Sequence, residues 1–226
     1  MSAQGDFFPL RANLHVESMQ YAADVRYGGI GTIIIPACIA ADDDIVGDNL
    51  DADAAIGTEL LTTAYEVDAK FGRNITMTAS GATGASANYR VRGKDYLGQP
   101  MYEDIEITNA EGTTQQVGKK AFKYVSSIKP TITAVNAVTV DCGVGNVLGL
   151  PYKTLAILNA LVSDVVPTAG TFVDGLTTGT AQTGLTDDPR GTYTPHASFV
   201  PNASHKYKLS CVVDVENLHG DAQSYV

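Results

Sequence analysis

The chain has 226 residues, 44% of them hydrophobic, which is enough to bury a substantial core and excludes disorder of the whole chain. Its formal net charge of −10 would repel a phosphate backbone, so direct nucleic-acid binding is excluded as a default function. Charged residues make up only 18% of the chain and 22 residues are Gly, a balance that favours short strands and tight turns over long solvated helices.

Residues 1–36 are predicted to form an extended N-terminal arm and a first strand. Apolar side chains such as Phe7 and Phe8 are mixed with polar ones at no sustained helical or strand period. The glycines within residues 28–31 suggest a flexible hinge before the β-branched run at residues 33–35. The sequence leaves open whether the arm lies on a neighbouring subunit or on its own domain.

The sequence contains no signal for export or membrane insertion. Its N-terminus lacks the basic region and apolar run of a signal peptide. The longest apolar piece, residues 30–41, is shorter than the roughly 20 residues that a membrane helix needs. Synthesis in the cytoplasm is therefore expected.

An acidic loop is predicted near residues 42–53, because like charges disfavour burial and short polar side chains favour turns. Asp42, Asp44 and Asp48 have the spacing of some calcium ligands. However, Val46 occupies a ligand position, and Asp53 stands where a calcium loop closes with a bidentate Glu. No metal site is predicted here.

The remainder of the chain, residues 37–226, is predicted to be a single β-sandwich or jelly-roll-like domain, so the fold class is all-β. Short alternating segments recur between turns, at residues 60–67, 74–78, 88–94, 101–108, 119–128, 132–140 and 206–215. A hairpin turn is expected at residues 94–100, leading onto the segment 101–108, with Gly98 available for a positive φ. Residues 155–166 fit both a helical stripe and a strand, with a strand favoured. Residues 168–194 are Gly/Thr-rich and are predicted to be a long loop.

No catalytic or cofactor-binding residues are predicted. The glycines of residues 143–149 invite comparison with a dinucleotide-binding loop, but Leu148 replaces the third glycine, so a turn between strands is expected. Glu103, Asp104 and Glu106 are predicted to be surface acids of one strand, because neighbouring side chains on a strand point to opposite faces. An enzyme is therefore not expected.

The cysteines and histidines do not have the spacing of metal ligands or of a disulfide framework. The cysteines, which are predicted to be small buried residues, are Cys38, Cys142 and Cys211. The histidines, which are predicted to be ordinary surface or loop residues, are His15, His196, His205 and His219.

Short motifs in a fixed order carry a resemblance to a known family. They are Arg-Asn-Ile-Thr at residues 73–76, Gly-Lys-Asp-Tyr-Leu-Gly-Gln-Pro-Met at 93–101, Val-Gly-Lys-Lys-Ala-Phe-Lys at 117–123, Gly-Leu-Pro-Tyr at 149–152 and Arg-Gly-Thr-Tyr-Thr-Pro at 190–195. In this order they resemble virion structural proteins of tailed bacteriophages, chiefly capsid decoration (cement) proteins. The similarity covers residues 73–201.

The resemblance implies a structural subunit that binds the outer surface of a phage capsid and stabilises it. Its partners would be the major capsid protein and other copies of itself, as a trimer or a dimer, without nucleic acid, membrane or cofactor. Its location would be the outer capsid surface of the virion, after synthesis in the host cytoplasm. Two alternatives stay open: a phage tail or baseplate subunit, and a carbohydrate-binding or adhesion module using Tyr193, Phe199 or Tyr207.

Overall fold

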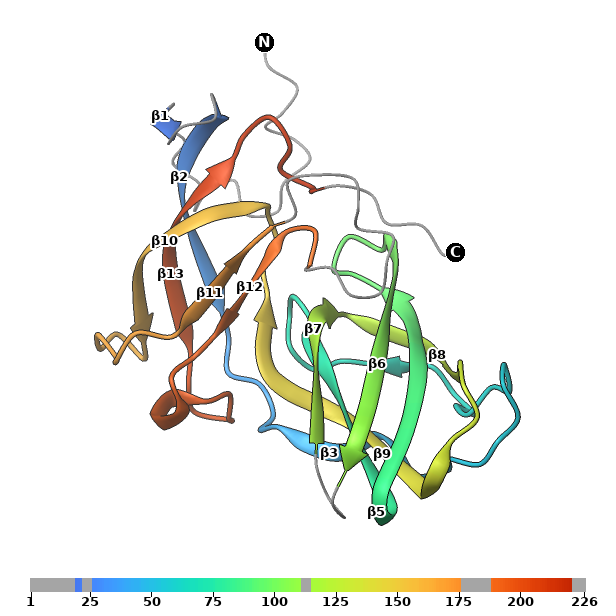
Figure 1. Ribbon diagram of the computed structural model, residues 1–226. Coiled ribbons are helices and arrows are strands. Elements are labelled where there is room, and N and C mark those ends of the chain that lie inside the picture. The colour runs from blue at the N-terminus through green and yellow to red at the C-terminus, as the bar shows by residue number, and fades with distance from the viewer. Residues whose placement is uncertain (1–18, 22–25, 111–114, 176–187, 221–226) are drawn as a thin grey trace.

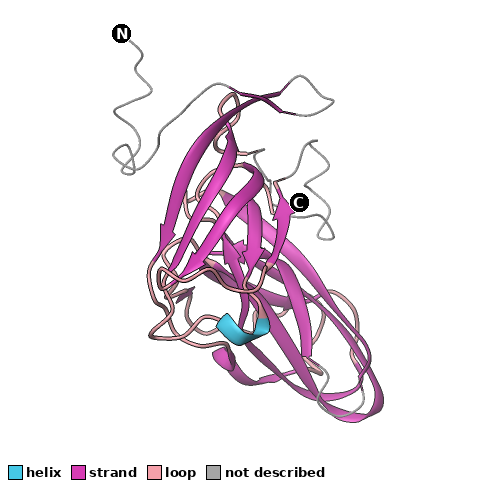
Figure 2. Cartoon of the chain, turned by 90° about the vertical axis from the view of Figure 1, so that its left-hand side faces the viewer, coloured by secondary structure: helices cyan, strands magenta, loops and turns pink. Residues whose placement is uncertain are grey.

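The computed structural model describes residues 19–21, 26–110, 115–175 and 188–220 (Figure 1). The chain is all-β, as predicted. Within these ranges the helical structure is limited to one 3-10 turn, η3 (Ala197–Phe199), visible against the strands in Figure 2. None of the described segments forms a helix long and apolar enough to cross a membrane.

The strands form two antiparallel sheets. A four-stranded sheet, sheet A, has the order β1 (Met19–Tyr21), β2 (Arg26–Ile35), β13 (Tyr207–Asp214) and β10 (Thr154–Val162). The other sheet has nine strands: β3 (Asp42–Asp51), β4 (Tyr65–Glu66), β5 (Arg73–Lys94), β6 (Pro100–Ala110), β7 (Gln115–Phe122), β8 (Tyr124–Pro130), β9 (Val135–Gly149), β11 (Thr171–Asp174) and β12 (Gly191–Thr194).

In space the strands divide into two lobes (Figure 1). Sheet A lies beside the β11–β12 ribbon in one lobe, which we call the sheet A lobe. Strands β3 to β9 form the other, which we call the sandwich lobe. The two lobes share a ladder, because β12 pairs with the last residues of β9.

The 22-residue strand β5 organises the sandwich lobe. Its first half pairs with β7 and β9, and its second half with β6 and β8. Phe122 and Tyr124, only two positions apart, pair with Arg73 and Lys94, the opposite ends of β5. A straight strand of this length would span roughly 70 Å. β5 therefore turns back on itself near its middle, where its register against β9 jumps, and its halves lie in the two layers of the lobe.

The predicted alternation of side chains is confirmed in the second half of β5, whereas in the first half the intervening Asn74 and Thr76 are buried too. Ile75 and Met77 from its first half are fully buried, as are Tyr89 and Val91 from its second half. Arg90, between the last two, is partly exposed. Burying an apolar side chain of this size contributes about 1.5–3 kcal/mol, so the alternation determines which face of the second half meets the core.

The predicted hairpin between β5 and β6 is also confirmed. Lys94 pairs with Pro100, and Gly98 has a φ of +80°. The Asp95 side chain accepts a hydrogen bond of 2.9 Å from the backbone N–H of Gln99. This bond fixes the direction of Asp95, which matters for the site described below.

Several predicted elements differ from the structure. Residues 119–128 are two strands, β7 and β8, separated at Lys123, because the chain passes there from one layer to the other. Residues 60–67 contribute only β4, and the loop predicted at residues 168–194 contains β11 and β12. The ambiguous residues 155–166 form a strand, β10, that ends in a two-residue turn.

The acidic loop predicted near residues 42–53 is a strand over most of its length. β3 pairs with β9 with two register shifts, and in it only Val46 is buried. Pairing uses backbone groups, so a segment rich in Asp can join a sheet while its side chains stay in water. Charged side chains on such an edge also oppose pairing with other chains.

The glycines at residues 28–31, predicted to be a hinge, lie inside β2. This strand is hydrogen bonded to β13 along its length, from Ile35–Tyr207 to Gly28–Asp214. The strand predicted at residues 33–35 is therefore part of β2, which is an inner strand of sheet A. Residues 1–18 of the predicted arm lie outside the described residues.

Candidate functional site

A cluster of buried charged side chains lies where the two lobes meet, and we call it the polar junction. The Arg190 guanidinium, immediately before β12, lies 2.5 Å from the Asp95 carboxylate in the β5–β6 turn. Arg190 also donates a 3.0 Å hydrogen bond to the backbone oxygen of Leu150. Only 1% of the Arg190 side chain and 2% of the Asp95 side chain are exposed. This ion pair therefore joins the lobes in a region closed to solvent.

Carboxylates in the junction accept three successive backbone N–H groups of β7. Glu103 accepts from Lys119 at 2.6 Å and from Lys120 at 3.2 Å. Asp188 accepts from Ala121 at 3.0 Å. These N–H groups lie at a bulge in the β5–β7 ladder, so the carboxylates replace the missing ladder acceptors.

Burial changes the titration of both carboxyl groups. Burial raises the pKa of Glu103 to about 7, although the two backbone donors and Lys120 oppose the shift. Burial also raises the pKa of Asp188, against the opposing effect of Arg190. Asp95 lies near Asp188 and adds to the upward shift of its pKa.

The prediction that Glu103 is a surface acid was wrong, because only 3% of it is exposed. The sequence did indicate this burial, because Glu103 lies on the same face of the strand as the buried Met101 and Ile105. Asp104 and Glu106 have the opposite phase and reach the surface as predicted. Asp104 makes a two-pronged ion pair with Arg90, at 2.7 and 2.8 Å.

Glycines provide the space that this arrangement needs. A Cβ atom at Gly118 would lie 2.7 Å from a Glu103 carboxylate oxygen, and one at Gly145 would lie 2.6 Å from the Asn74 side chain. Asn74 bridges these segments, donating to the Gly118 oxygen at 3.0 Å and accepting from the Val147 N–H at 2.9 Å.

Residues 143–149 are therefore not a turn but part of β9. Their glycines allow close contact between neighbouring chain segments. The Arg73 guanidinium contributes to the same contact and donates to the Gly145 oxygen at 2.8 Å and to the Ile39 oxygen at 2.7 Å.

The motifs found in the sequence contact one another through these bonds. Asp95 and Arg190 come from the second and fifth motifs, and Leu150 from the fourth. Asn74 and Gly118 link the first and third motifs. Residues as far as 95 positions apart in the chain are therefore in direct contact, which sequence reasoning did not anticipate.

Among the other candidate groups that the structure describes, one set of acidic side chains could hold a metal ion. The carboxylates of Asp42, Asp43 and Asp44 converge, but all three residues are exposed. The cysteines, Cys38, Cys142 and Cys211, are buried free thiols, as predicted.

Within the described ranges, no histidine belongs to a group of side chains that could hold a metal ion. His196 accepts from the Ser198 N–H at the start of η3, and His205 contacts Asn202 and the Val200 oxygen. His15 lies outside the described residues.

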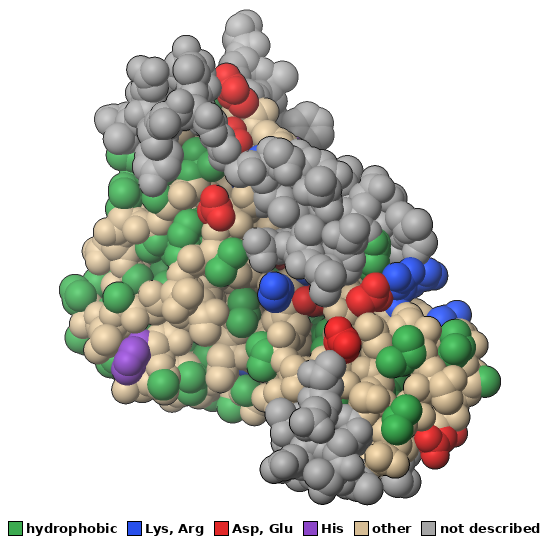
Figure 3. Space-filling model, in the orientation of Figure 1, with side chains coloured by type: hydrophobic (Ala, Val, Ile, Leu, Met, Phe, Trp, Pro, Cys, Tyr) green, Lys and Arg blue, Asp and Glu red, His purple; other side chains and the backbone are tan. Residues whose placement is uncertain are grey.

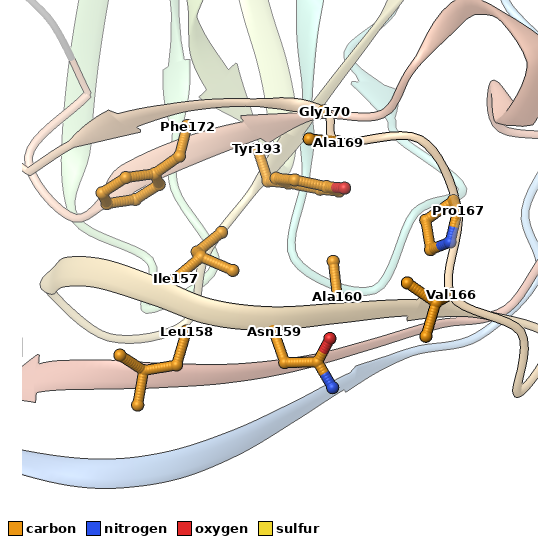
Figure 4. Close-up of a pocket in the computed structure, with 10 residues that line it drawn as sticks. All are labelled: Ile157, Leu158, Asn159, Ala160, Val166, Pro167, Ala169, Gly170, Phe172 and Tyr193. Atoms are coloured by element: carbon orange, nitrogen blue, oxygen red, sulfur yellow. The ribbon is translucent and has the colours of Figure 1, made fainter.

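A second candidate site is an apolar pocket of about 280 Å³ between β10 and the β11–β12 ribbon (Figure 4). Ile157, Phe172 and Tyr193 point into it, and no lining residue is charged. Leu158 and Val166 at its rim are 55% and 70% exposed. We call this cavity the β10 pocket.

The Tyr193 side chain lines the β10 pocket and carries a hydroxyl group. Only 2% of the residue is exposed, and the hydroxyl makes no well-aligned hydrogen bond with a described residue. Burial raises the pKa of Tyr193, although the neighbouring backbone N–H of Gly170 lowers it in part. The pocket lining is thus mainly apolar, with the Tyr193 hydroxyl and the Asn159 side chain as its polar groups.

The tyrosines named for a carbohydrate site do not form a surface platform. Tyr193 and Tyr207 are buried, and the Tyr207 hydroxyl donates a 2.7 Å hydrogen bond to the Phe199 oxygen. Burial accordingly raises the pKa of Tyr207. Neither tyrosine therefore offers the exposed ring face that stacking on a sugar requires, and Phe199 is half-buried.

Comparison with known proteins adds no assignment: no family model matches the chain, and neither a curated protein nor a solved structure is similar to it.

Proposed function

We propose that this chain is a structural protein of a tailed-phage virion that binds the outer surface of the capsid and stabilises it. The observation that carries the proposal is the contact between the motifs at the polar junction. If the motifs were chance matches, nothing would require them to meet in the fold. Their direct hydrogen bonds and ion pair are what we would expect of residues that a family keeps in order to hold its fold.

The surface agrees with a binding and stabilising role. The described part of the chain combines a rigid β framework with separately exposed large apolar side chains, among them Val117, Leu158 and Val166. Figure 3 shows hydrophobic side chains distributed over the visible face of the sheet A lobe. Stable protein interfaces bury about 1,600 Å² in total, and copies arranged on a lattice add avidity. The proposed partners are the major capsid protein and further copies of this chain.

The proposed mechanism is mechanical. A subunit that bridges neighbouring capsid proteins adds binding free energy to the assembled shell and none to its separated parts. The ion pair between Arg190 and Asp95 would then keep the two lobes of the bridge at a constant relative position. A tail or baseplate subunit remains the alternative, because the same rigid architecture suits both locations.

The decisive experiment is quantitative mass spectrometry of purified particles, with the major capsid protein as internal reference. Near-stoichiometric abundance would support a decoration protein, and a few copies per particle would place the chain in the tail. If the chain is absent from the particles, the virion proposal fails. Adding the purified chain to capsids that lack it, followed by heating, tests stabilisation: we expect shells to open at a higher temperature.

A further inference from the structure

We propose that the β10 pocket is the docking site of residues 1–18 of the same molecule, with a phenyl ring of the Phe7–Phe8 pair inserted between β10 and β11. This inference does not depend on the proposed function.

The dimensions and chemistry of the pocket suit one apolar side chain. Ligand pockets for small molecules usually enclose about 300–1,000 Å³. The β10 pocket, at about 280 Å³, lies just below that range. Ile157 and Phe172 provide apolar walls, and the lining has no charge that would select an ionic ligand. An aromatic ring placed against Phe172 would gain both burial and ring contact.

The Tyr193 hydroxyl indicates that the occupant also has a polar group. A buried hydroxyl without a well-aligned partner costs free energy, because it has lost its hydrogen bonds to water. A pure hydrocarbon would leave that cost in place. A peptide offers a backbone carbonyl next to each side chain, so a phenylalanine together with its own backbone meets both requirements of the site.

The position of residues 1–18 makes them the occupant that fits best. They lead into Met19, the first residue of β1, and β1 and β10 are the opposite edges of sheet A. Three strand spacings, about 15 Å, separate those edges. The eleven or twelve residue steps from Met19 back to the Phe7–Phe8 pair can extend over roughly 35–40 Å, so the segment is long enough. Attachment to the same molecule also gives it a high effective concentration.

Composition supports the same assignment. Residues 1–18 contain Phe7, Phe8, Leu10 and Leu14. The exposed Leu158 and Val166 at the pocket rim provide further apolar surface for the residues beside the inserted ring.

The test uses the full-length protein and methyl NMR signals of Ile157 and Ala160, which line the pocket. The double variant Phe7→Ser/Phe8→Ser is expected to shift both signals, whereas the matched control Leu14→Ser leaves them in place. A synthetic peptide of residues 1–18, added to the double variant, should restore the original positions saturably. The same peptide carrying the two serines should bind at least about ten-fold more weakly.

The peptide comparison keeps the test independent of folding, because its two arms use one protein and change only the ligand. Unchanged Ile157 and Ala160 signals in the double variant would overturn the proposal. So would a wild-type peptide that fails to restore them. If wild-type signals moved towards those of the double variant on dilution, the segment would come from a second copy, which contradicts docking within one molecule.

Discussion

Arg190 and Asp95 show how this protein holds charges away from water. Isolated buried ions cost several kcal/mol, so such a pair is retained only with good geometry and further hydrogen bonds. Arg190 has both, through Asp95 and the Leu150 oxygen. Arg90 and Asp104 form a comparable pair near the surface, with 29% and 22% of their side chains exposed. The two pairs allow a direct comparison of burial.

We predict that Arg190→Met lowers the free energy of unfolding by about 3–5 kcal/mol, because the carboxylate of Asp95 is left buried without its partner. Arg90→Met should cost less than about 1 kcal/mol, since water screens Asp104. Urea denaturation followed by circular dichroism measures both. Equal losses for the two variants would contradict the role assigned to burial.

Glu103 makes stability depend on pH. Its pKa is raised from 4.5 to about 7, so between these values the native state binds the proton more tightly than the unfolded chain does. Protonation therefore favours folding, and this contribution is lost as the pH rises through about 7. We predict that Glu103→Gln removes the decline in stability between pH 4.5 and 7.

The control for this prediction is Glu106→Gln, on the same strand but exposed. It should leave the pH profile of the wild type unchanged. Thermal unfolding from pH 4.5 to 8 gives the comparison. Parallel profiles for wild type and Glu103→Gln would show that Glu103 does not titrate in this range.

At the scale of elements, glycines in one hairpin serve different purposes. Gly98 needs its positive φ but has open space around it, with no atom within 4 Å of an added Cβ. Gly93 needs the space, because an added Cβ would lie 1.9 Å from the Tyr124 oxygen where β5 meets β8. Only the positive φ of Gly98 is a local property that a turn motif in the sequence can indicate.

We predict that Gly98→Ala costs about 1–2 kcal/mol from its left-handed backbone, and that Gly98→Asn costs less. Gly93→Ala should be far more damaging, because strand backbones cannot move apart without breaking their ladder. Soluble yield and urea denaturation of the three variants test this order. A Gly93→Ala protein as stable as Gly98→Ala would contradict the close approach of β5 and β8.

Strands and turns were predicted correctly where they depend only on the local sequence. The alternation around Tyr89 and Val91 and the turn at Gly98 were predicted correctly. The prediction failed where the position of a pairing strand determines the structure. Residues 119–128 have a continuous strand pattern, yet they split at Lys123 because the two halves of β5 lie in different layers. The Asp-rich β3 is a strand because β9 offers it a free edge.

At the scale of the whole molecule, the polar junction and the β9–β12 ladder join the two lobes. Cys142 lies in β9 of the sandwich lobe and Cys211 in β13 of the sheet A lobe, and both are fully buried. Burial raises the pKa of Cys142 and raises the pKa of Cys211 to about 12, so both thiols should be unreactive in the native state.

We predict that Cys142 and Cys211 become reactive at the same urea concentration, because the lobes unfold as one cooperative unit. In Arg190→Met, Cys211 should react at lower urea than Cys142, since the sheet A lobe loses its ion pair with the sandwich. Pulsed thiol labelling with peptide mapping measures each site. Separate transitions in the wild type would show that the lobes are independent.

The sequence by itself determined the all-β class, the phase of most strands, the Gly98 hairpin and the burial of the cysteines. These properties follow from local alternation and backbone preference. The tertiary structure decided the reversal of β5, the incorporation of the Asp-rich segment into a sheet and the meeting of Asp95 with Arg190. It also decided the role of Glu103. The strand alternation indicated that its side chain points inward, but not that it would bind backbone groups of β7. Long-range pairing depends on which distant segments the fold brings together, and no local pattern specifies that.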